Sequence, residues 1–214
     1  MMALNDIARE AGVPAQCIEI IARWEGCLRK IAQNLYKAYL CPAGVPTIGR
    51  GTTWYNDRGV KVKLSDPPIN LEECDRLLAY DIKVKYSPAV RRAVKPGRFQ
   101  SENQYSACVS FAYNVGEHGF AKSTLCWLIN QGRYQDAANE FNRWTRGGGR
   151  VLPGLVNRRR DERLLFLKPG AAYSGENQPL ATPAKIGVPV LDAVPPKQQP
   201  KRGLIASLLF WRKI

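Results

Sequence analysis

The stretch from Trp24 to Trp54 constrains the fold more than any other part of the chain. An apolar helical pattern leads into an acid, Glu25, and a β-rich segment carrying Thr47 follows a Pro-Ala-Gly turn at residues 42–44. A helix that delivers a carboxyl group to the edge of a hairpin is one way to build a glycosidase site, because the acid can then protonate the leaving oxygen. We therefore expect the remaining elements to be arranged around this helix and hairpin.

The residues on both sides of Glu25 repeat apolar side chains at three- and four-residue steps, up to Leu35. Taken alone, this pattern predicts one helix from Pro14 to about Tyr36. Such a helix would carry the hairpin far from the acid. A working site therefore requires a break at Gly26. The residues that follow are expected to fold away from the site, and either to stay helical or to form a separate short helix.

Other elements are indicated by local patterns. Asn70, followed three residues later by an acid, predicts the start of a helix, and Ser101 does the same with Gln104. The second of these helices, over residues 105–115, is mostly apolar and is the candidate central buried helix. A strand is expected around residues 59–63, and a last helix from about residue 153 to 167.

Four stretches, in order, carry a family resemblance: the T-I-G-x-G motif at residues 47–51, and residues 109–116, 144–148 and 154–162. They resemble the phage-type lysozymes, glycoside hydrolase family 24, and their lambdoid endolysin branch in particular. The resemblance covers roughly residues 15–168. It implies an α+β, mainly helical, lysozyme-like fold, in which a long helix joins a small β-hairpin lobe to a helical lobe around a cleft.

The resemblance also implies an activity: hydrolysis of the β-1,4 bond between N-acetylmuramic acid and N-acetylglucosamine in peptidoglycan, without a cofactor or metal. Glu25, Cys41 and Thr47 are the expected catalytic residues, with Glu25 as general acid and Thr47 holding a water. Cys41 stands where many relatives have Asp, and it follows Glu25 by sixteen residues, seven more than in the family. A thiol acts as a base or nucleophile only as thiolate, which Lys37 or Arg50 would favour; the alternative is a cysteine that only packs.

The resemblance implies substrate contacts as well. Tyr113 and Asn114 match an aromatic-amide pair that would hold a sugar ring and its N-acetyl group, although Tyr113 also fits a helix core. Arg50 would place a cation at the edge of the cleft. The arginine run at residues 158–160 is typical of a solvated helix face with an ion pair to Glu162. The full set of expected substrate-binding residues is Tyr39, Arg50, Tyr113, Asn114, Ser123, Thr124 and Arg158.

Net charge and cysteine content limit which partners and metal sites can be expected. The net charge of +14 favours an anionic partner, but the chain has no nucleic-acid recognition motif, so no nucleic acid is expected. The six cysteines contain no C-x-x-C pair, and the single histidine, His118, excludes a His-rich zinc site. We expect most cysteines to be small core residues rather than a disulfide framework.

Composition divides the chain into a lysozyme-like domain (1–168), a Pro-rich flexible linker (169–202) and an apolar, basic tail (203–214). The tail is expected to contact an anionic membrane or envelope surface, or else to fold back on the domain. Residues 1–13 lack the apolar segment of a signal peptide, so we expect the protein to be made in the host cytoplasm and to reach the wall after membrane passage. We also expect a monomer. The alternatives are a catalytically impaired wall-binding module and a virion-associated one.

Overall fold

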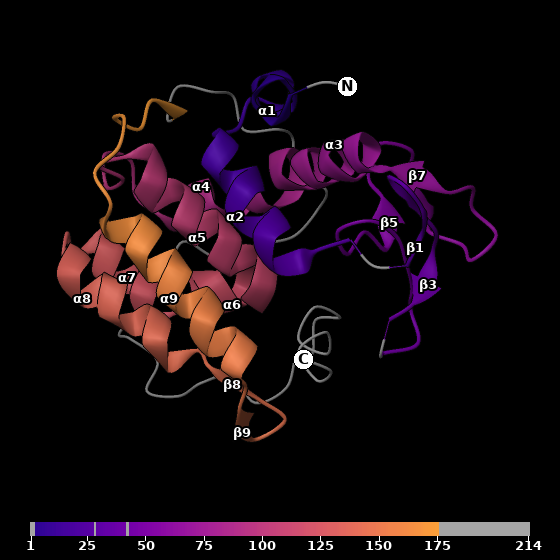
Figure 1. The fold of residues 1–214 in the computed structure, drawn as a ribbon. Helices are drawn as coiled ribbons and strands as arrows, with labels where there is room; N and C mark the ends of the chain where they lie inside the picture. The colour runs from indigo at the N-terminus through magenta and orange to yellow at the C-terminus, as the bar shows by residue number, and fades with distance from the viewer. Residues whose placement is uncertain (1–2, 28, 42, 176–214) are drawn as a thin grey trace.

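A computed structural model describes residues 3–27, 29–41 and 43–175, and Figure 1 shows a strand-rich lobe beside a larger helical lobe. The α-helices are α1 (Leu4–Ala11), α2 (Ala15–Glu25), α3 (Leu71–Asp81), α4 (Ser87–Ala93), α5 (Glu102–Val115), α6 (Glu117–Ala121), α7 (Thr124–Asn130), α8 (Tyr134–Glu140) and α9 (Pro153–Leu167). A π-helical turn, η1 (Ile82–Tyr86), and a 3-10 turn, η2 (Phe141–Arg143), complete the helical elements. The strands are β1 (Lys30–Ala32), β2 (Leu35–Tyr36), β3 (Tyr39–Leu40), β4 (Pro46–Thr47), β5 (Trp54–Tyr55), β6 (Val60–Lys61), β7 (Ile69–Asn70), β8 (Arg146–Gly147) and β9 (Arg150–Val151).

A long helical segment joins the two lobes. The Asn70 side chain accepts a hydrogen bond from the Glu73 amide at 2.8 Å, which confirms the predicted cap of α3. The backbone then continues through η1 into α4 without leaving helical conformation. This is the long connecting helix that the sequence predicted. No helix among the described residues combines the length and the apolar composition that a membrane crossing requires.

The helical lobe is built around α5. Ser101 caps this helix by accepting from the Gln104 amide at 3.3 Å, as predicted. Every residue from 103 to 114 is buried, and α2 and α9 pack directly against the helix. Figure 1 shows α5 enclosed by the other helices of this lobe. The predicted α+β, mainly helical, lysozyme-like fold is confirmed.

The hairpins of the smaller lobe follow the predicted order. Strands β3 and β4 are antiparallel, with Tyr39 opposite Thr47. Strands β5 and β6 form a second hairpin, in which Trp54 pairs with Lys61. The strand expected around residues 59–63 is therefore present as β6.

The break after the predicted acid is confirmed, but the residues beyond it are not helical. Helix α2 ends at Glu25, and Gly26 takes φ 58° and ψ −169°, a conformation outside the helix. The helical expectation for the following segment is wrong, because it forms strands β1 and β2. Arg29 and Asn34 have positive φ angles of 58° and 61°, which a right-handed helix excludes, and β2 pairs with β7.

Both ends of the described chain pack against the helical lobe. The lead-in at residues 1–13 contains α1, which buries Ile7 and Ala8 and ends at Gly12 in the left-handed region. At the other end, residues 169–175 of the predicted linker pack on the helical lobe. The Tyr173 ring is stacked on Tyr105 with centroids 4.5 Å apart. The remainder of the linker and the tail lie outside the described residues.

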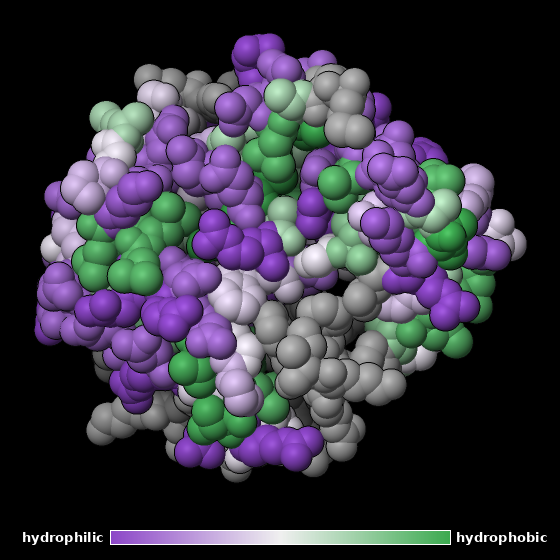
Figure 2. Space-filling view, viewed as in Figure 1, coloured by the Kyte–Doolittle hydropathy of each residue, from purple (hydrophilic) through white to green (hydrophobic). Residues whose placement is uncertain are grey.

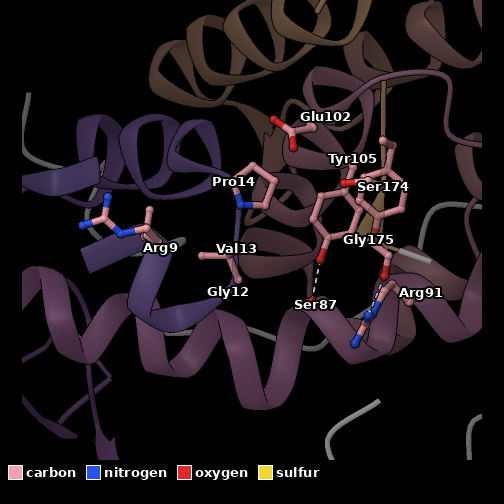
Figure 3. A pocket seen from close by; sticks show the side chains of 12 residues that line it. Arg9, Gly12, Val13, Pro14, Ser87, Arg91, Glu102, Tyr105, Ser174 and Gly175 are labelled. Carbon is pink, nitrogen blue, oxygen red and sulfur yellow. Dashed lines mark hydrogen bonds between the residues drawn. The ribbon is translucent and has the colours of Figure 1, made fainter. Parts of the chain in front are cut away.

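A pocket of about 260 Å³ lies between α1, α4, α5 and this C-terminal segment (Figure 3). Arg91 donates to the Gly175 carbonyl at 2.8 Å, and the Tyr105 hydroxyl is bonded to Ser87. None of the residues lining the pocket belongs to the predicted catalytic set. It is therefore separate from the site described below.

Gly26→Ala should lower the free energy of unfolding by about 1–3 kcal/mol, because only glycine readily takes this backbone conformation. No atom lies within 4 Å of a Cβ placed there, so the cost comes from the backbone alone. Urea denaturation measures it. The control is Gln131→Ala at the C-cap of α7, where φ is −88° and a change within about 0.5 kcal/mol is expected. Equal effects at both positions would contradict a backbone requirement at Gly26.

Candidate active site

Glu25 is held in a buried ion pair at the end of α2. Its side chain is 6% exposed, and its Oε1 accepts a hydrogen bond from Nη1 of the fully buried Arg158 at 2.6 Å. Arg158 lies on α9, so the pair joins two helices that are distant in sequence. The neighbour that orients the carboxyl group is thus a guanidinium group.

The ion pair belongs to a larger buried cluster. Glu162, one turn further along α9, accepts from Arg158 Nε at 3.1 Å and lies 3.1 Å from Arg159 Nη1. On α5, Ser110 donates its hydroxyl to Glu162 at 2.7 Å, and Arg159 donates to the Asn114 side chain at 2.7 Å. We call Glu25, Arg158, Arg159 and Glu162 the four-charge cluster; its two cations balance its two anions.

The environment shifts the two arginines in opposite directions. Burial alone would lower the pKa of Arg158, but the charges of Glu25 and Glu162 outweigh it and raise that pKa. For Arg159, burial prevails over the attraction of Glu162 and lowers the pKa to about 10. Both arginine side chains therefore remain charged at neutral pH.

The expected solvated face at residues 158–160 is wrong for two of the three arginines. Arg158 and Arg159 are fully buried, whereas the Arg160 side chain is 65% exposed. The predicted pairing with Glu162 is present, and both buried arginines take part in it. Carboxylates on α2 and α9 compensate the buried charges, which is why a run of three arginines tolerates a core position.

The T-I-G-R-G segment turns directly over Glu25. A Cβ placed on Gly51 would lie 3.8 Å from Glu25 Oε2 and 3.5 Å from the Tyr113 hydroxyl. The Tyr113 hydroxyl in turn donates to the Arg50 carbonyl at 2.9 Å. Gly51 has φ +95°, a backbone conformation that favours glycine, whereas a Cβ at these distances would make ordinary van der Waals contacts. The turn, the acid and α5 are thereby fixed relative to one another.

The sequence predicted that Arg50 would lie at the exposed edge of a cleft. In the structure its side chain is instead mostly buried. It pairs with Asp75 on α3 and donates to the Ala22 carbonyl on α2 at 2.9 Å. The side chain is 11% exposed. Arg50 therefore links the start of the long helix to the helix that carries Glu25.

Cys41 and Thr47 lie together on the β3–β4 hairpin. The Thr47 hydroxyl donates to the Val45 carbonyl at 2.9 Å, and the Cys41 amide donates to the same carbonyl at 3.0 Å. Both residues are buried. Burial, with smaller contributions from Cys41 and Glu25, raises the pKa of Tyr39, the strand partner of Thr47, to about 12. Tyr39 therefore lies within electrostatic range of Glu25.

The remaining predicted contacts separate into two groups. Asn114 and Tyr113 are buried on α5 beside the four-charge cluster and the glycine turn. Ser123 instead caps α7: it donates to the Phe120 carbonyl at 2.6 Å and accepts from the Cys126 amide at 3.0 Å. Thr124, the first residue of α7, is half-buried. The Ser123 hydroxyl therefore uses its only donor on the Phe120 carbonyl and one acceptor position on the cap of α7.

The assembled groups suit proton transfer to a leaving oxygen. Glu25 supplies a carboxyl group, Thr47 a hydroxyl group with free lone pairs, and Cys41 a thiol.

The sequence did not predict Gly51, Ser110 and Arg159 as parts of the site, although the spacing of Arg159 and Glu162 on one helix face was a usable signal. Within the described residues, no three side chains of His, Cys, Asp or Glu are grouped in a way that could hold a metal ion.

The chain is similar in sequence and fold to several known proteins. The family model described as Phage lysozyme matches residues 22–162. An endolysin of Bacillus phage B103 is 39% identical over 150 residues, which cover 70% of this chain and 52% of the endolysin. An endolysin of Salmonella phage P22 is 37% identical over 131 residues, covering 61% and 86% respectively. The crystal structure of a P22 lysozyme mutant gives a TM-score of 0.61 at 33% identity, covering 73% of this chain and 98% of that one. The chain spans about half the length of the Bacillus phage relatives that it matches.

Arg158→Met should lower the free energy of unfolding by about 3–5 kcal/mol, because it leaves buried carboxylates without their cation. The matched control is Arg160→Met, two residues away on the exposed side of α9, which should change stability by no more than about 0.5 kcal/mol. Chemical denaturation of both variants makes the comparison. Similar losses for the two would show that the four-charge cluster does not stabilise the fold as described.

Proposed function

The chain belongs to the phage lysozyme family, and from this premise we propose that it hydrolyses the β-1,4 bond between N-acetylmuramic acid and N-acetylglucosamine in bacterial peptidoglycan. The observation that carries the proposal is the buried ion pair of Glu25 with Arg158 beneath the glycine turn. The ion pair fixes one oxygen of the carboxyl group. The other, Oε2, faces the backbone of the T-I-G-R-G segment.

In the proposed reaction, Glu25 is protonated in the complex with substrate and donates that proton to the glycosidic oxygen as the bond to the anomeric carbon breaks. Thr47 holds a water molecule on the other side of the sugar, because its donor is used by Val45 while its lone pairs stay free. Cys41 assists as a thiolate, either by taking a proton from that water or by attacking the anomeric carbon. The first route inverts the configuration and the second retains it.

Tyr39, Tyr113, Asn114 and the half-buried Thr124 stay as candidate sugar contacts. Arg158 and Arg50 are better described as positioning residues, since their guanidinium groups bind Glu25, Asp75 and a backbone carbonyl. Ser123 holds the start of α7 in place.

We further propose that the protein acts as an endolysin, reaching the wall of its host after passage across the membrane and working as a monomer during lysis. The names of its phage relatives support this setting. The tail at residues 203–214 lies outside the described residues. Its proposed contact with an anionic envelope surface rests on its apolar and basic sequence.

Glu25→Gln should abolish the clearing of purified sacculi, because an amide has no proton to donate to the leaving oxygen. Its thermal midpoint should fall below that of the parent, because Arg158 loses a buried charged partner, so clearing is compared at a temperature at which both proteins are folded. Turbidity loss of a sacculus suspension measures the activity. The control is Glu19→Gln, an exposed acid on the same helix, which should clear at the parent rate. Clearing by Glu25→Gln at the parent rate would remove Glu25 from the mechanism.

Cys41→Ser should lose much of the activity, whereas Cys41→Asp should retain or raise it. A serine keeps a hydroxyl group but has no anionic form near neutral pH, while an aspartate supplies a carboxylate. The same turbidity assay ranks the three proteins. If the serine variant is as active as the parent, Cys41 has only a packing role.

A further inference from the structure

The hairpin of β1 and β2 carries an exposed apolar face. This hairpin contains the residues that make the spacing between Glu25 and Cys41 longer than in the family. Strand β1 is the edge of a three-stranded sheet in the order β1-β2-β7, and all three of its residues are exposed. Ile31 and Leu35 are 50% and 38% exposed. Such exposure of large apolar side chains on a short hairpin is a feature that burial in the fold does not explain.

The register separates the hairpin into an inner and an outer face. Lys30 pairs with Tyr36 and Tyr36 with Ile69, and Ile69 packs on the small core of this lobe, so the Tyr36 side is the inner face. Leu35 alternates with Tyr36 and therefore points outward. An irregularity between Lys30 and Ala32 sets Ile31 and Ala32 opposite the single residue Leu35, which gathers the three apolar side chains on the outer face.

Cations lie beside this apolar face. Lys37 is two residues beyond Leu35, and its amide donates to the Arg29 carbonyl at 3.1 Å, so the alternation carries Lys37 to the outer face next to Arg29. Among the described residues, Arg29, Lys30 and Lys37 make no ion pair with a carboxylate. The sequence has no acidic residue from position 26 to 56. All charged residues within the hairpin itself are therefore cations.

Exposed apolar residues continue along the same lobe. Leu40 and Val45, at the next hairpin, are 55% and 40% exposed. Figure 2 shows hydrophobic and hydrophilic residues side by side over the strand-rich lobe. We call the outer face formed by Arg29, Ile31, Ala32, Leu35 and Lys37 the hairpin patch.

We propose that the hairpin patch docks the protein on an anionic phospholipid bilayer. Apolar side chains next to unpaired cations match the boundary between acyl chains and negatively charged headgroups. There the apolar side chains are removed from water and the cations are attracted to the headgroups, and both effects favour binding. A hydrophilic anionic polymer of the wall would be met by the cations alone and would leave Ile31 and Leu35 without a role. The mixture of the two therefore favours the lipid surface.

Binding of the full-length protein to vesicles tests the proposal without using hydrolysis. Parent protein should bind mixed phosphatidylglycerol–phosphatidylcholine vesicles more tightly than pure phosphatidylcholine vesicles. Arg29→Gln with Lys37→Gln should weaken binding to the anionic vesicles by about tenfold or more, because each cation near such a surface contributes strongly. Ile31→Ser with Leu35→Ser should weaken it by a similar factor, and the single change Ile31→Ser by less.

The matched control is Leu164→Ser on α9, whose parent side chain is 55% exposed but lies on the other lobe. It should bind like the parent, and all variants contain the same tail, so that any tail contribution cancels. Thermal midpoints equal to that of the parent establish that the variants are folded. Parent-like binding by both double variants would overturn the proposal. So would a loss confined to the charge variant, because that result indicates a hydrophilic anionic polymer as the partner.

Discussion

The structure depends on four charges buried where α2, α5 and α9 meet. Moving an isolated ion into a protein interior costs several kcal/mol, so Arg158 and Arg159 are tolerated only because Glu25 and Glu162 lie within ion-pair distance. The geometry of the three helices must keep these groups together. Ser110 donates a hydrogen bond to Glu162 and Asn114 accepts one from Arg159, which ties α5 to the same cluster.

This cluster explains how a residue at a helix end becomes a fixed acid. Gly26 ends α2 directly after Glu25, and Arg158 holds the carboxyl group of Glu25 in one orientation. Arg50 pairs with Asp75 on α3 and donates to the Ala22 carbonyl on α2, so it ties the T-I-G-R-G turn to both helices.

Features set by local rules could be predicted from the sequence. Side-chain caps at Asn70 and Ser101 and the hairpin that presents Thr47 follow from residues within a few positions of each. The break at Gly26 did not follow from the local pattern; it was predicted because a working site requires the hairpin to lie near Glu25. Features set by distant partners could not be predicted. Residues 28–35 repeat apolar side chains like a helix, yet the pairing of Leu35 with Asn70 and the positive φ of Asn34 make a hairpin. Likewise, only Glu25, far away in the sequence, makes Arg158 a core residue.

The central claim is that the site hydrolyses the glycosidic bond at the anomeric carbon of N-acetylmuramic acid. Purified sacculi digested with the protein, reduced with borohydride and analysed by mass spectrometry give the most direct measurement. The account predicts new reduced N-acetylmuramic acid ends, because hydrolysis leaves water's oxygen on the anomeric carbon of that sugar. Ends consisting of 1,6-anhydro-muramic acid, or of reduced N-acetylglucosamine, would contradict it.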